Sequence, residues 1–410
     1  MVSAPTVQLA SRSGGEDAAA QLGLTVGAEI LDGGSAARVF HATAPDGAEV
    51  ALKILVSAPG LVDGHDVGSF LGKLTQQNWI RAGDAALAER YLPVLHVVRG
   101  SGWAAYTTPF YESVDSAASL RDGPDCTEFF TLYTRLVKDL IVYGYGQTIV
   151  PAGPDFVDSV LVGRVPRRRP LLAAALPPGL LDIDRLIVNG RECANPLHLL
   201  ARFTADPPPW WSRLAPPRLM FPAHGDANTR NVLVGADGLR LIDPRGSTAY
   251  WDPIYDLAKT LFSLTVWDPA LRLGGGARHT ADGWIVGFRQ PVFAGYLAAA
   301  GQFIRRLAAI PDLMGLLDCD PHWQERLLWT HGLHVLAEAA CRLSDPKPKT
   351  DLTGTPIARE DMALCHYLVG ALLLTDLARK SASGSVDVDD HLSLLTFPTF
   401  TAAGNQRAAS

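Results

Sequence analysis

Residues 221–259, FPAHGDANTRNVLVGADGLRLIDPRGSTAYWDPIYDLAK, constrain the fold of this chain more than any other stretch. Two apolar segments, NVLV and LRLID, flank GADG, and an Asp-Gly pair between such segments predicts a β-hairpin turned at Asp237 and Gly238. A hairpin of this kind sets Asn231 near the start of one strand and Asp243 at the end of its partner. The two side chains can therefore converge on one metal ion.

The residue types in this stretch suit a site for Mg²⁺ and phosphate. Oxygen ligands from Asp and Asn are typical of Mg²⁺, which keeps waters and takes further ligands from substrate phosphates. Asp226 lies five residues before Asn231, on the loop that precedes the hairpin, where it can accept a proton from an attacking hydroxyl. One positioning base, one Asn and one Asp on Mg²⁺ form the layout of phosphoryl transfer.

The pattern HGD-x4-N followed by IDP resembles the catalytic loop and metal loop of the aminoglycoside phosphotransferase and choline kinase superfamily, which are small-molecule relatives of the protein kinases. The protein-kinase forms are H-R-D-x4-N and D-F-G. The resemblance implies an α+β, bilobal protein-kinase-like fold with a small N-terminal antiparallel-sheet lobe and a larger, mainly helical C-terminal lobe. It also implies Asp226 as the catalytic base, Asn231 and Asp243 as metal ligands, and ATP as the phosphate donor.

A second group of candidate residues lies near the N-terminus. EVALKIL resembles the V-A-I-K strand of kinases, which makes Lys53 the candidate phosphate-binding lysine, although a solvated strand lysine is the alternative. Gly33, Gly34 and Ser35 lie at an earlier turn, in the place of a kinase glycine-rich loop. Ala37 stands where the third glycine of that loop would be, so only part of the fingerprint is present.

The carboxylate that holds the kinase lysine is missing from its expected place. Residues 57–98 show a helical period from Phe70 and then a second short helix. A kinase supplies a helix glutamate to the lysine, but the expected turn offers only Gln76 and Gln77. Three interpretations stay open: Glu89 reaches back, a glutamine orients the lysine, or a shifted register hides the partner.

The segment after this helix resembles the hinge of a kinase. GWAAYTTPFYESVDS, residues 102–116, alternates like a strand and breaks at Pro109. By the resemblance, residues 109–112 bind adenine through backbone groups and Glu112 contacts the ribose. A buried edge strand with no role in binding is the alternative.

Three residues near the metal loop have expected roles. Arg245 either adds positive charge at the nucleotide phosphates or pairs with a carboxylate such as Asp252. The Asp-Pro pair at 252–253 suits the start of a helix. In the superfamily the aspartate of YDLAK, here Asp256, ties down the catalytic loop, which implies a structural role.

Composition at the two ends, and the resemblance to a kinase between them, divide the chain into four parts. We expect a flexible leader over 1–22, an N-terminal nucleotide-binding lobe over 23–112, a C-terminal catalytic and substrate-binding lobe over 113–385 with an irregular insert at 151–222, and a tail over 386–410.

Within the large lobe, most of the chain is predicted to be helical. Residues 125–148, 285–345 and 358–380 carry the helical patterns. The basic run at 164–169 is expected to be a solvated loop, because the chain has no repeated basic face.

Overall charge and cysteine spacing limit the class of protein. The 410 residues carry a formal net charge of −6, which argues against nucleic-acid binding. Five widely spaced cysteines without a C-x-x-C pair indicate free thiols in a reducing compartment. The first residues do not resemble a signal peptide, and the apolar runs are too short to span a bilayer. We therefore expect a cytoplasmic protein with no membrane partner.

The sequence thus predicts an ATP- and Mg²⁺-dependent O-phosphotransferase that acts on a hydroxyl of a small molecule, such as an antibiotic, nucleoside, amino sugar or amino alcohol. A pseudokinase or nucleotide-binding scaffold without turnover is the alternative. A non-catalytic partner protein on the same fold is less favoured. A protein kinase is disfavoured, because YDLAK follows the metal loop too soon for an activation segment. The acceptor and the oligomeric state are left open.

Overall fold

The structure, a computed structural model, describes residues 15–30, 37–57, 66–153, 156–345 and 347–400. The chain divides into two compact units. The sheet unit consists of Met1–Ser116, His224–Ala249 and Ser344–Pro346, and the helical unit consists of Ala117–Ala223, Tyr250–Leu343 and Lys347–Ser410. The α+β class and the two predicted lobes are confirmed. The catalytic and metal loops, however, belong with the N-terminal sheet.

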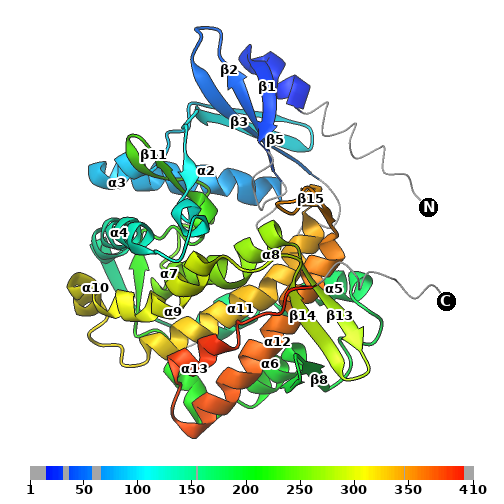
Figure 1. The fold of residues 1–410 in the computed structure, drawn as a ribbon. Helices are drawn as coiled ribbons and strands as arrows, with labels where there is room; N and C mark the ends of the chain where they lie inside the picture. The colour runs from blue at the N-terminus through cyan, green and yellow to red at the C-terminus, as the bar shows by residue number, and fades with distance from the viewer. Residues whose placement is uncertain (1–14, 31–36, 58–65, 154–155, 346, 401–410) are drawn as a thin grey trace, which may run out of the picture. The chain divides into compact units, whose positions relative to one another are not determined.

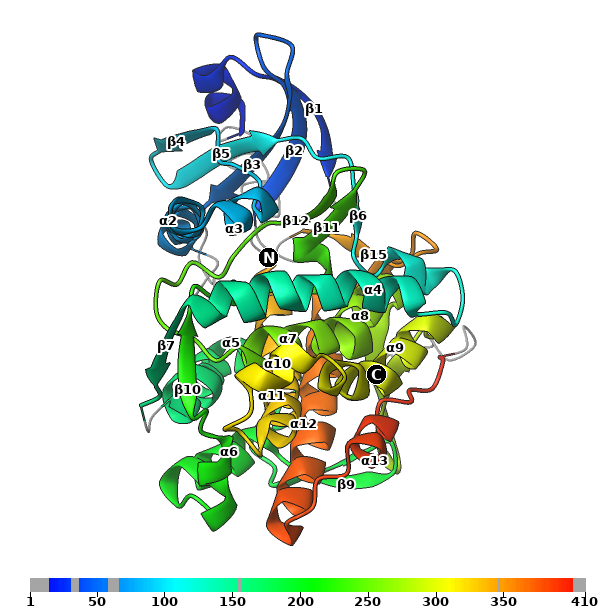
Figure 2. The same ribbon diagram turned by 90° about the vertical axis from the view of Figure 1, so that its left-hand side faces the viewer.

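A five-stranded antiparallel sheet forms the centre of the sheet unit (Figures 1 and 2), in the order β1-β2-β3-β5-β4. Its strands are β1 (Thr25–Ile30), β2 (Arg38–Thr43), β3 (Glu49–Val56), β4 (His96–Gly100) and β5 (Trp103–Pro109). Strands β3 and β5 pair so that Lys53 lies directly opposite Tyr106. Because side chains alternate along a strand, these two residues point to the same face of the sheet.

Each face of the sheet buries its own apolar cluster. On the Lys53 face, Leu55 and Ala104 pack with Phe70 and Leu74 of helix α2 (Val67–Gly83). The other face packs against a helix formed by residues 15–22. The flexible leader expected over 1–22 is therefore a helix in this part, because its small side chains Ala18 and Ala19 are buried against the sheet.

An aspartate stands at each end of helix α2. Asp66 precedes it, and its carboxylate accepts a hydrogen bond from the amide of Ser69 at 2.9 Å. Asp84 follows it and caps α3 (Ala85–Arg90) by accepting from the amide of Leu87. The two predicted helices of this segment are thus confirmed.

The predicted hairpin is present in the sheet unit. It consists of β11 (Val232–Gly235) and β12 (Gly238–Leu241), and β11 also pairs with β6 (Val114–Asp115). Gly235 pairs with Gly238, so the two-residue turn is Ala236-Asp237, one position earlier than predicted. Gly238 has φ = 96°, which explains why glycine opens the returning strand.

Helices dominate the second unit, as predicted (Figure 2). They are α4 (Thr127–Leu136, continued as a π-helix over Val137–Gly144), α5 (Arg169–Ala175), α6 (Pro196–Ala205), α7 (Ile254–Phe262), α8 (Asp268–Leu273), α9 (Ala294–Ala308), α10 (Pro311–Leu316), α11 (Trp323–Ser344), α12 (Arg359–Ser383) and α13 (Val388–Ser393). Glycines let α11 and α12 approach closely: a Cβ on Gly370 would lie 2.9 Å from the Cβ of Leu336, and one on Gly332 would lie 3.0 Å from Leu374.

The segment 151–222 is more regular than predicted. It contains α5, α6 and the strands β8 (Arg185–Val188), β9 (Arg191–Ala194) and β10 (Arg218–Phe221). Strand β10 pairs with β7 (Thr148–Pro151). Strands β8 and β9 extend a sheet with β13 (Gly275–Thr280) and β14 (Gly283–Phe288).

The basic run at its start is not a solvated loop throughout. Arg164 is buried and donates to the hydroxyl of Tyr255 at 2.8 Å and to Nδ1 of His334 at 2.9 Å. Arg168 donates to the carbonyl of Ala337. The expectation was wrong because these partners lie more than 90 residues away in the sequence and complete a buried polar network.

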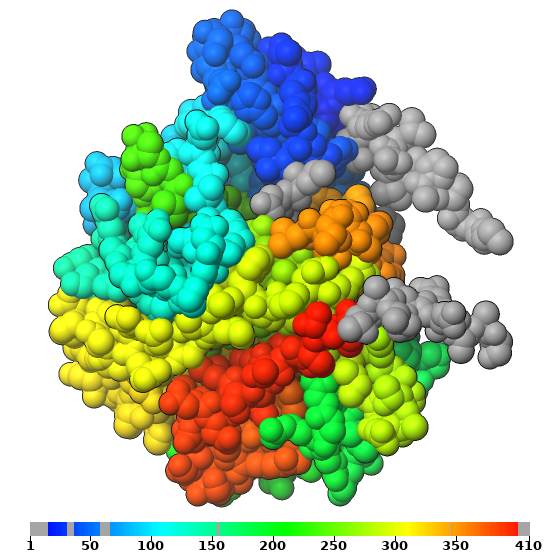
Figure 3. All heavy atoms as spheres, viewed as in Figure 1, coloured from blue at the N-terminus to red at the C-terminus, as the bar shows by residue number. Residues whose placement is uncertain are grey.

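The end of the described chain lies on the helical unit. Two short strands, β15 (Lys349–Thr350) and β16 (Pro356–Ile357), precede α12. After α13, the amide of Phe400 donates to the carbonyl of Phe288 on β14 at 2.7 Å. Figure 3 shows this segment in red on the surface of the unit. Helix α12 is long and apolar enough to cross a membrane, but 83% of that stretch is buried inside the fold, as in the core helix of a globular protein.

Candidate active site

The catalytic loop, residues 224–231, is held by its own polar side chains. Asn228 accepts hydrogen bonds from the amides of Arg230 and Asn231, both at 3.1 Å, and so caps the short turn that carries Asn231. The Nδ2 atom of Asn231 donates to the carbonyl oxygen of Asp226 at 2.8 Å and to its Oδ2 at 3.2 Å. The predicted base and the predicted metal-binding amide therefore lie together, and Asn231 orients the carboxylate of Asp226.

His224 joins this loop to the strand that leads to Asp243. Its Nδ1 accepts from the amide of Asp226 at 3.1 Å, so its Nε2 carries the proton and donates to the carbonyl of Ile242 at 3.0 Å. Burial lowers the pKa of His224 to about 4, which keeps the ring neutral near pH 7. The ring also stacks on Tyr91 at 5.9 Å. His224 therefore braces the loop through both ring nitrogens.

Asp243 occupies a strained position at the end of β12. Its φ is 54°, in the left-handed region that non-glycine residues seldom adopt. Strain of this kind persists where the surroundings hold it in place, and it gathers at functional sites. Lys53 forms an ion pair with Oδ2 of Asp243, and the hydroxyl of Tyr106 donates to Oδ1 at 3.3 Å. Lys53 and Tyr106, which lie opposite each other on β3 and β5, thus hold the carboxylate of Asp243.

The charges around Asp243 keep it ionised. Burial alone would raise its pKa, but the ammonium groups of Lys53 and Lys73 and the bond from Tyr106 hold the pKa well below its ordinary value. The same carboxylate raises the pKa of Tyr106, in addition to the effect of burial. An ionised oxygen ligand is what a divalent cation requires.

Helix α2 touches the metal loop, Asp243–Ser247, through a glutamine. Gln76 is buried, and its Oε1 accepts from the amide of Gly246 at 2.5 Å and from that of Ser247 at 3.0 Å. Its Nε2 donates to the carbonyl of His224 at 3.4 Å. The first interpretation, that Glu89 reaches back to Lys53, is not supported because the side chain of Glu89 is exposed. In this structure Lys53 pairs with Asp243 instead.

The donor set fits a magnesium ion. Because Nδ2 of Asn231 is used inside the loop, its Oδ1 is the atom left for a cation, and Asp243 supplies an ionised carboxylate. Within the described residues, no group of three or more His, Cys, Asp or Glu side chains gathers as a metal site. A site with two protein oxygens suits a cation whose other ligands are phosphates and water.

The remaining predicted residues are only partly placed. Gly33, Gly34 and Ser35 lie outside the described residues. The side chain of Arg245 lies against Gly225, and a Cβ added to Gly225 would come within 2.8 Å of the Cβ of Arg245. Gly225 also has φ = 76°, so both the space and the backbone conformation at this position favour glycine. Glu112 has an exposed side chain, and no hydrogen bond or ion pair joins it to the other candidate residues among those described.

Two expectations concerned the segment after the metal loop. Asp252 accepts a hydrogen bond from the amide of Ile254 at the start of α7, which confirms the predicted helix start. Its carboxylate also accepts a hydrogen bond from Nε of Arg326 at 2.8 Å, so Arg326 is its cation partner in the helical unit. Asp256 is buried near the start of α7, and its proposed tie to the catalytic loop stays a prediction.

Three residues of the site were not assigned these contacts from the sequence. Tyr106 donates a hydrogen bond to Asp243, Lys73 acts on Asp243 through its charge, and Gln76 binds the backbone of the metal loop. Tyr106 could be found from the strand register, since it faces Lys53 across β3 and β5. The α2 residues are found only when the packing of that helix on Gly246 is known.

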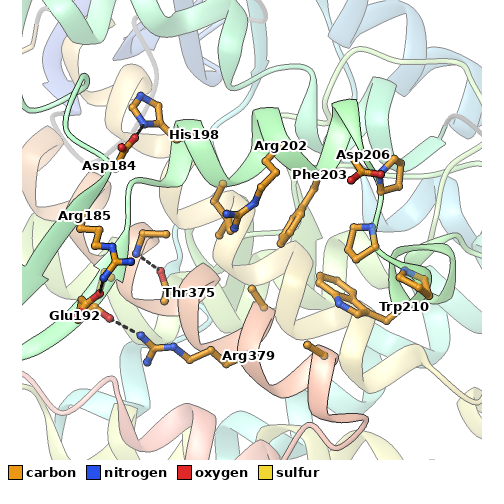
Figure 4. Close-up of a pocket in the computed structure, with 18 residues that line it drawn as sticks. Asp184, Arg185, Glu192, His198, Arg202, Phe203, Asp206, Trp210, Thr375 and Arg379 are labelled. Atoms are coloured by element: carbon orange, nitrogen blue, oxygen red, sulfur yellow. Dashed lines mark hydrogen bonds and ion pairs between the residues drawn. The ribbon is translucent and has the colours of Figure 1, made fainter.

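The helical unit has a groove of about 1030 Å³ near β9, α6 and α12 (Figure 4). Several of its charged side chains bind partners within the groove. His198 pairs with Asp184 at 2.9 Å, Arg185 pairs with Glu192 at 2.6 Å, and Arg379 donates to the carbonyl of Glu192 at 2.8 Å. The candidate phosphoryl-transfer residues lie in the other unit.

A sheet lysine and tyrosine bind the aspartate of one loop, and an aspartate and asparagine face each other on the loop before it. The sheet unit and the helical unit agree with the α+β fold of two lobes that the sequence predicted. No protein-family model matches the chain, and no curated protein matches it. Solved structures with a similar fold include an aminoglycoside phosphotransferase APH(4)-Ia mutant in a ternary complex with ADP and hygromycin B (15% identity, 88% of this chain and 97% of that chain, TM-score 0.45).

Two further structures are of the same kind. Aminoglycoside-3'-phosphotransferase of type VIII is 18% identical over 79% of this chain and 97% of that chain, with a TM-score of 0.44. An ethanolamine kinase of Plasmodium vivax is 9% identical over 86% of this chain and 83% of that chain, with a TM-score of 0.45. All three are small-molecule phosphotransferases, the kind of protein that the sequence motifs resembled.

Proposed function

We propose that this protein is an ATP- and Mg²⁺-dependent O-phosphotransferase that transfers the γ-phosphate to a hydroxyl of a small molecule. The observation that carries the proposal is the pairing of two motifs in one unit. Asn231 orients the carboxylate of Asp226, and the hairpin that starts at Asn231 returns Asp243 to Lys53. Ordinary hairpins do not require an aspartate at φ = 54° with a lysine on its carboxylate.

The nucleotide half of the site consists of Lys53, Asn231 and Asp243. Asn231 Oδ1 and the Asp243 carboxylate would hold Mg²⁺, which neutralises phosphate charge when bound. Lys53, which pairs with Asp243 in this structure, would bind the phosphate oxygens of the nucleotide. Gly33, Gly34 and Ser35 are proposed to cover the phosphates, Glu112 to contact the ribose, and Arg245 to add positive charge.

The acceptor half of the reaction depends on Asp226. Its carboxylate takes the proton of the acceptor hydroxyl as the hydroxyl oxygen bonds to phosphorus and the bond to ADP breaks. Transfer of this kind needs positioning and charge neutralisation more than covalent chemistry. The hydrogen bond from Asn231 keeps Asp226 in one orientation, which supports its role as the base.

The acceptor class is proposed more broadly. Antibiotics including aminoglycosides and nucleosides, amino sugars and amino alcohols all present a hydroxyl beside polar groups, and an antibiotic acceptor would make the protein a resistance factor. No disulfide joins the five cysteines, all of which lie in the described part of the chain, and this supports the proposed cytoplasmic location. A nucleotide-binding scaffold without turnover is the second candidate, because α2 contains no acidic residue to hold Lys53 away from Asp243.

An ATP-consumption screen over sugars, nucleosides, aminoglycosides and choline-like alcohols tests this proposal. With an acceptor in hand, Asp226→Asn should lower kcat about 100-fold or more, because it removes the base, while ADP binding is kept. Asp237→Asn is the matched control, since Asp237 is an exposed aspartate on the hairpin turn of the same segment. Turnover by Asp226→Asn at the wild-type rate would remove Asp226 as the base. Nucleotide binding with no turnover on any acceptor would favour the scaffold.

A further inference from the structure

Gln76 has an unusual set of partners for a helix side chain. It is 2% exposed, and both ends of its carboxamide bind backbone groups of the two functional loops. The Oε1 atom accepts from the amides of Gly246 and Ser247, and the Nε2 atom donates to the carbonyl of His224. One side chain therefore joins the metal loop to the catalytic loop.

The backbone around this side chain is built for a close approach. A Cβ on Gly72 would lie 3.2 Å from the carbonyl oxygen of Gly246, and a Cβ on Gly246 would lie 3.1 Å from the carbonyl oxygen of Ser69. Gly246 has φ = 91°, which glycine adopts without strain. Glycines on both sides thus let α2 touch the metal loop directly, so that Gln76 reaches it.

The chemistry of the contact selects glutamine over glutamate. The amides of Gly246 and Ser247 need an acceptor, whereas the carbonyl of His224 needs a donor. A carboxamide has both, and an ionised carboxylate has no donor. A glutamate here would keep the two bonds to the metal loop and place an oxygen against the His224 carbonyl.

The same two loops carry the reacting groups. Asp243 lies three residues before Gly246, and Asp226 lies two residues after His224. The carbonyl of His224 also accepts from the amide of Arg245 at 2.8 Å, so the loops are already in contact where Gln76 joins them. A fixed distance between these loops sets the distance between the base and the metal carboxylate.

We propose that Gln76 is a positioning residue that holds the metal loop in register with the catalytic loop, in place of the glutamate that kinases use on this helix. This inference rests on the proposed phosphotransfer function for its effect on turnover. Its effect on the metal loop itself does not depend on that function. The two parts can therefore be tested separately.

Gln77 provides a matched control. It is the next residue of α2, it is 4% exposed, and its Nε2 donates to the carbonyl of Leu92, which follows α3. Gln76→Met and Gln77→Met each remove one buried carboxamide from the same helix at similar volume. They should lose similar amounts of thermal stability, and they differ in whether the metal loop loses its contact.

The first measurement is amide hydrogen exchange of residues 244–248, with and without Mg·ADP. In Gln76→Met the amides of Gly246 and Ser247 lose their acceptor, and their exchange should be on the order of tenfold faster. Gln77→Met should leave these amides at the wild-type rate, and Gln76→Glu should keep their protection. Wild-type exchange in Gln76→Met, or equal acceleration in Gln77→Met, would overturn the proposal.

The second measurement is calorimetry with Mg·ADP, followed by turnover with an acceptor. Gln76→Met should bind Mg·ADP about tenfold more weakly, as expected for two lost hydrogen bonds of ordinary strength. Gln76→Glu should bind it more tightly than Gln76→Met and still show a reduced kcat, because the His224 contact is lost. Wild-type affinity and kcat in Gln76→Met would refute the positioning role. If the wild-type protein binds no Mg·ADP, the proposed function fails. Amide exchange of residues 244–248 without ligand still tests whether Gln76 holds the metal loop.

Discussion

The ion pair between Lys53 and Asp243 should stabilise the sheet unit strongly. Their side chains are only 10% and 13% exposed, and each is the other's charge partner at the edge of the core. Lys53→Met leaves a carboxylate in a poorly solvated place beside Tyr106. Breaking a buried pair in this way costs about 3 kcal/mol, at the low end for such pairs because some solvent reaches both groups.

Native-state hydrogen exchange measures this cost within one unit. A loss of about 3 kcal/mol corresponds to amide exchange on the order of 100-fold faster in β3 and β5. The double variant Lys53→Met/Asp243→Asn should lose less stability than the two single variants added together. Each single variant leaves one buried charge without its partner, whereas the double variant removes both charges. Arg38→Met is the control in the same sheet: its pair with Glu29 is more exposed, so the loss should be about 1 kcal/mol or less. Wild-type exchange in Lys53→Met, or full additivity, would refute this reasoning.

Three further predictions concern stability. Gly225→Ala should cost about 1–2 kcal/mol in urea denaturation, because φ is 76° and the added Cβ meets the stem of Arg245; an unchanged midpoint would contradict this. Stability should fall as pH drops from 6.5 towards 4: burial holds the pKa of His224 at about 4, so the unfolded chain binds the proton first. This contribution of about 3 kcal/mol is complete above pH 6.5, and His224→Gln should flatten that part of the curve. Arg326→Met should lower the free energy of unfolding by about 3–5 kcal/mol, because the buried carboxylate of Asp252 loses the charge that it pairs with. Faster hydrogen exchange of the α11 amides measures this loss.

The functional loops were predictable because their signal is local. Asn231 and Asp243 flank one short hairpin, whose turn residues and apolar segments determine where these two side chains go, and Asp226 lies on the loop just before it. The turn was displaced by one residue, because Gly238 opens the returning strand and Ala236-Asp237 makes the turn.

The contacts that were missed depend on distant packing. Gln76 looks like any polar residue of a helix until Gly246 is placed beside it. Arg164 was expected in solvent, yet it is buried against Tyr255 and His334, which come from separate helices. The leader was expected to be flexible because its residues are small, and small residues such as Ala18 are also what fits closely on a sheet. Single-sequence patterns do not distinguish these outcomes.

The central claim is that Asp243 and Asn231 bind a divalent cation together with a nucleotide. Calorimetric titration with ATP in the presence and in the absence of Mg²⁺ tests it most directly, with Asp243→Ala as the comparison. The account predicts ATP binding that requires Mg²⁺ and is lost in Asp243→Ala. ATP affinity that is absent with Mg²⁺, or that is unchanged in Asp243→Ala, would contradict it.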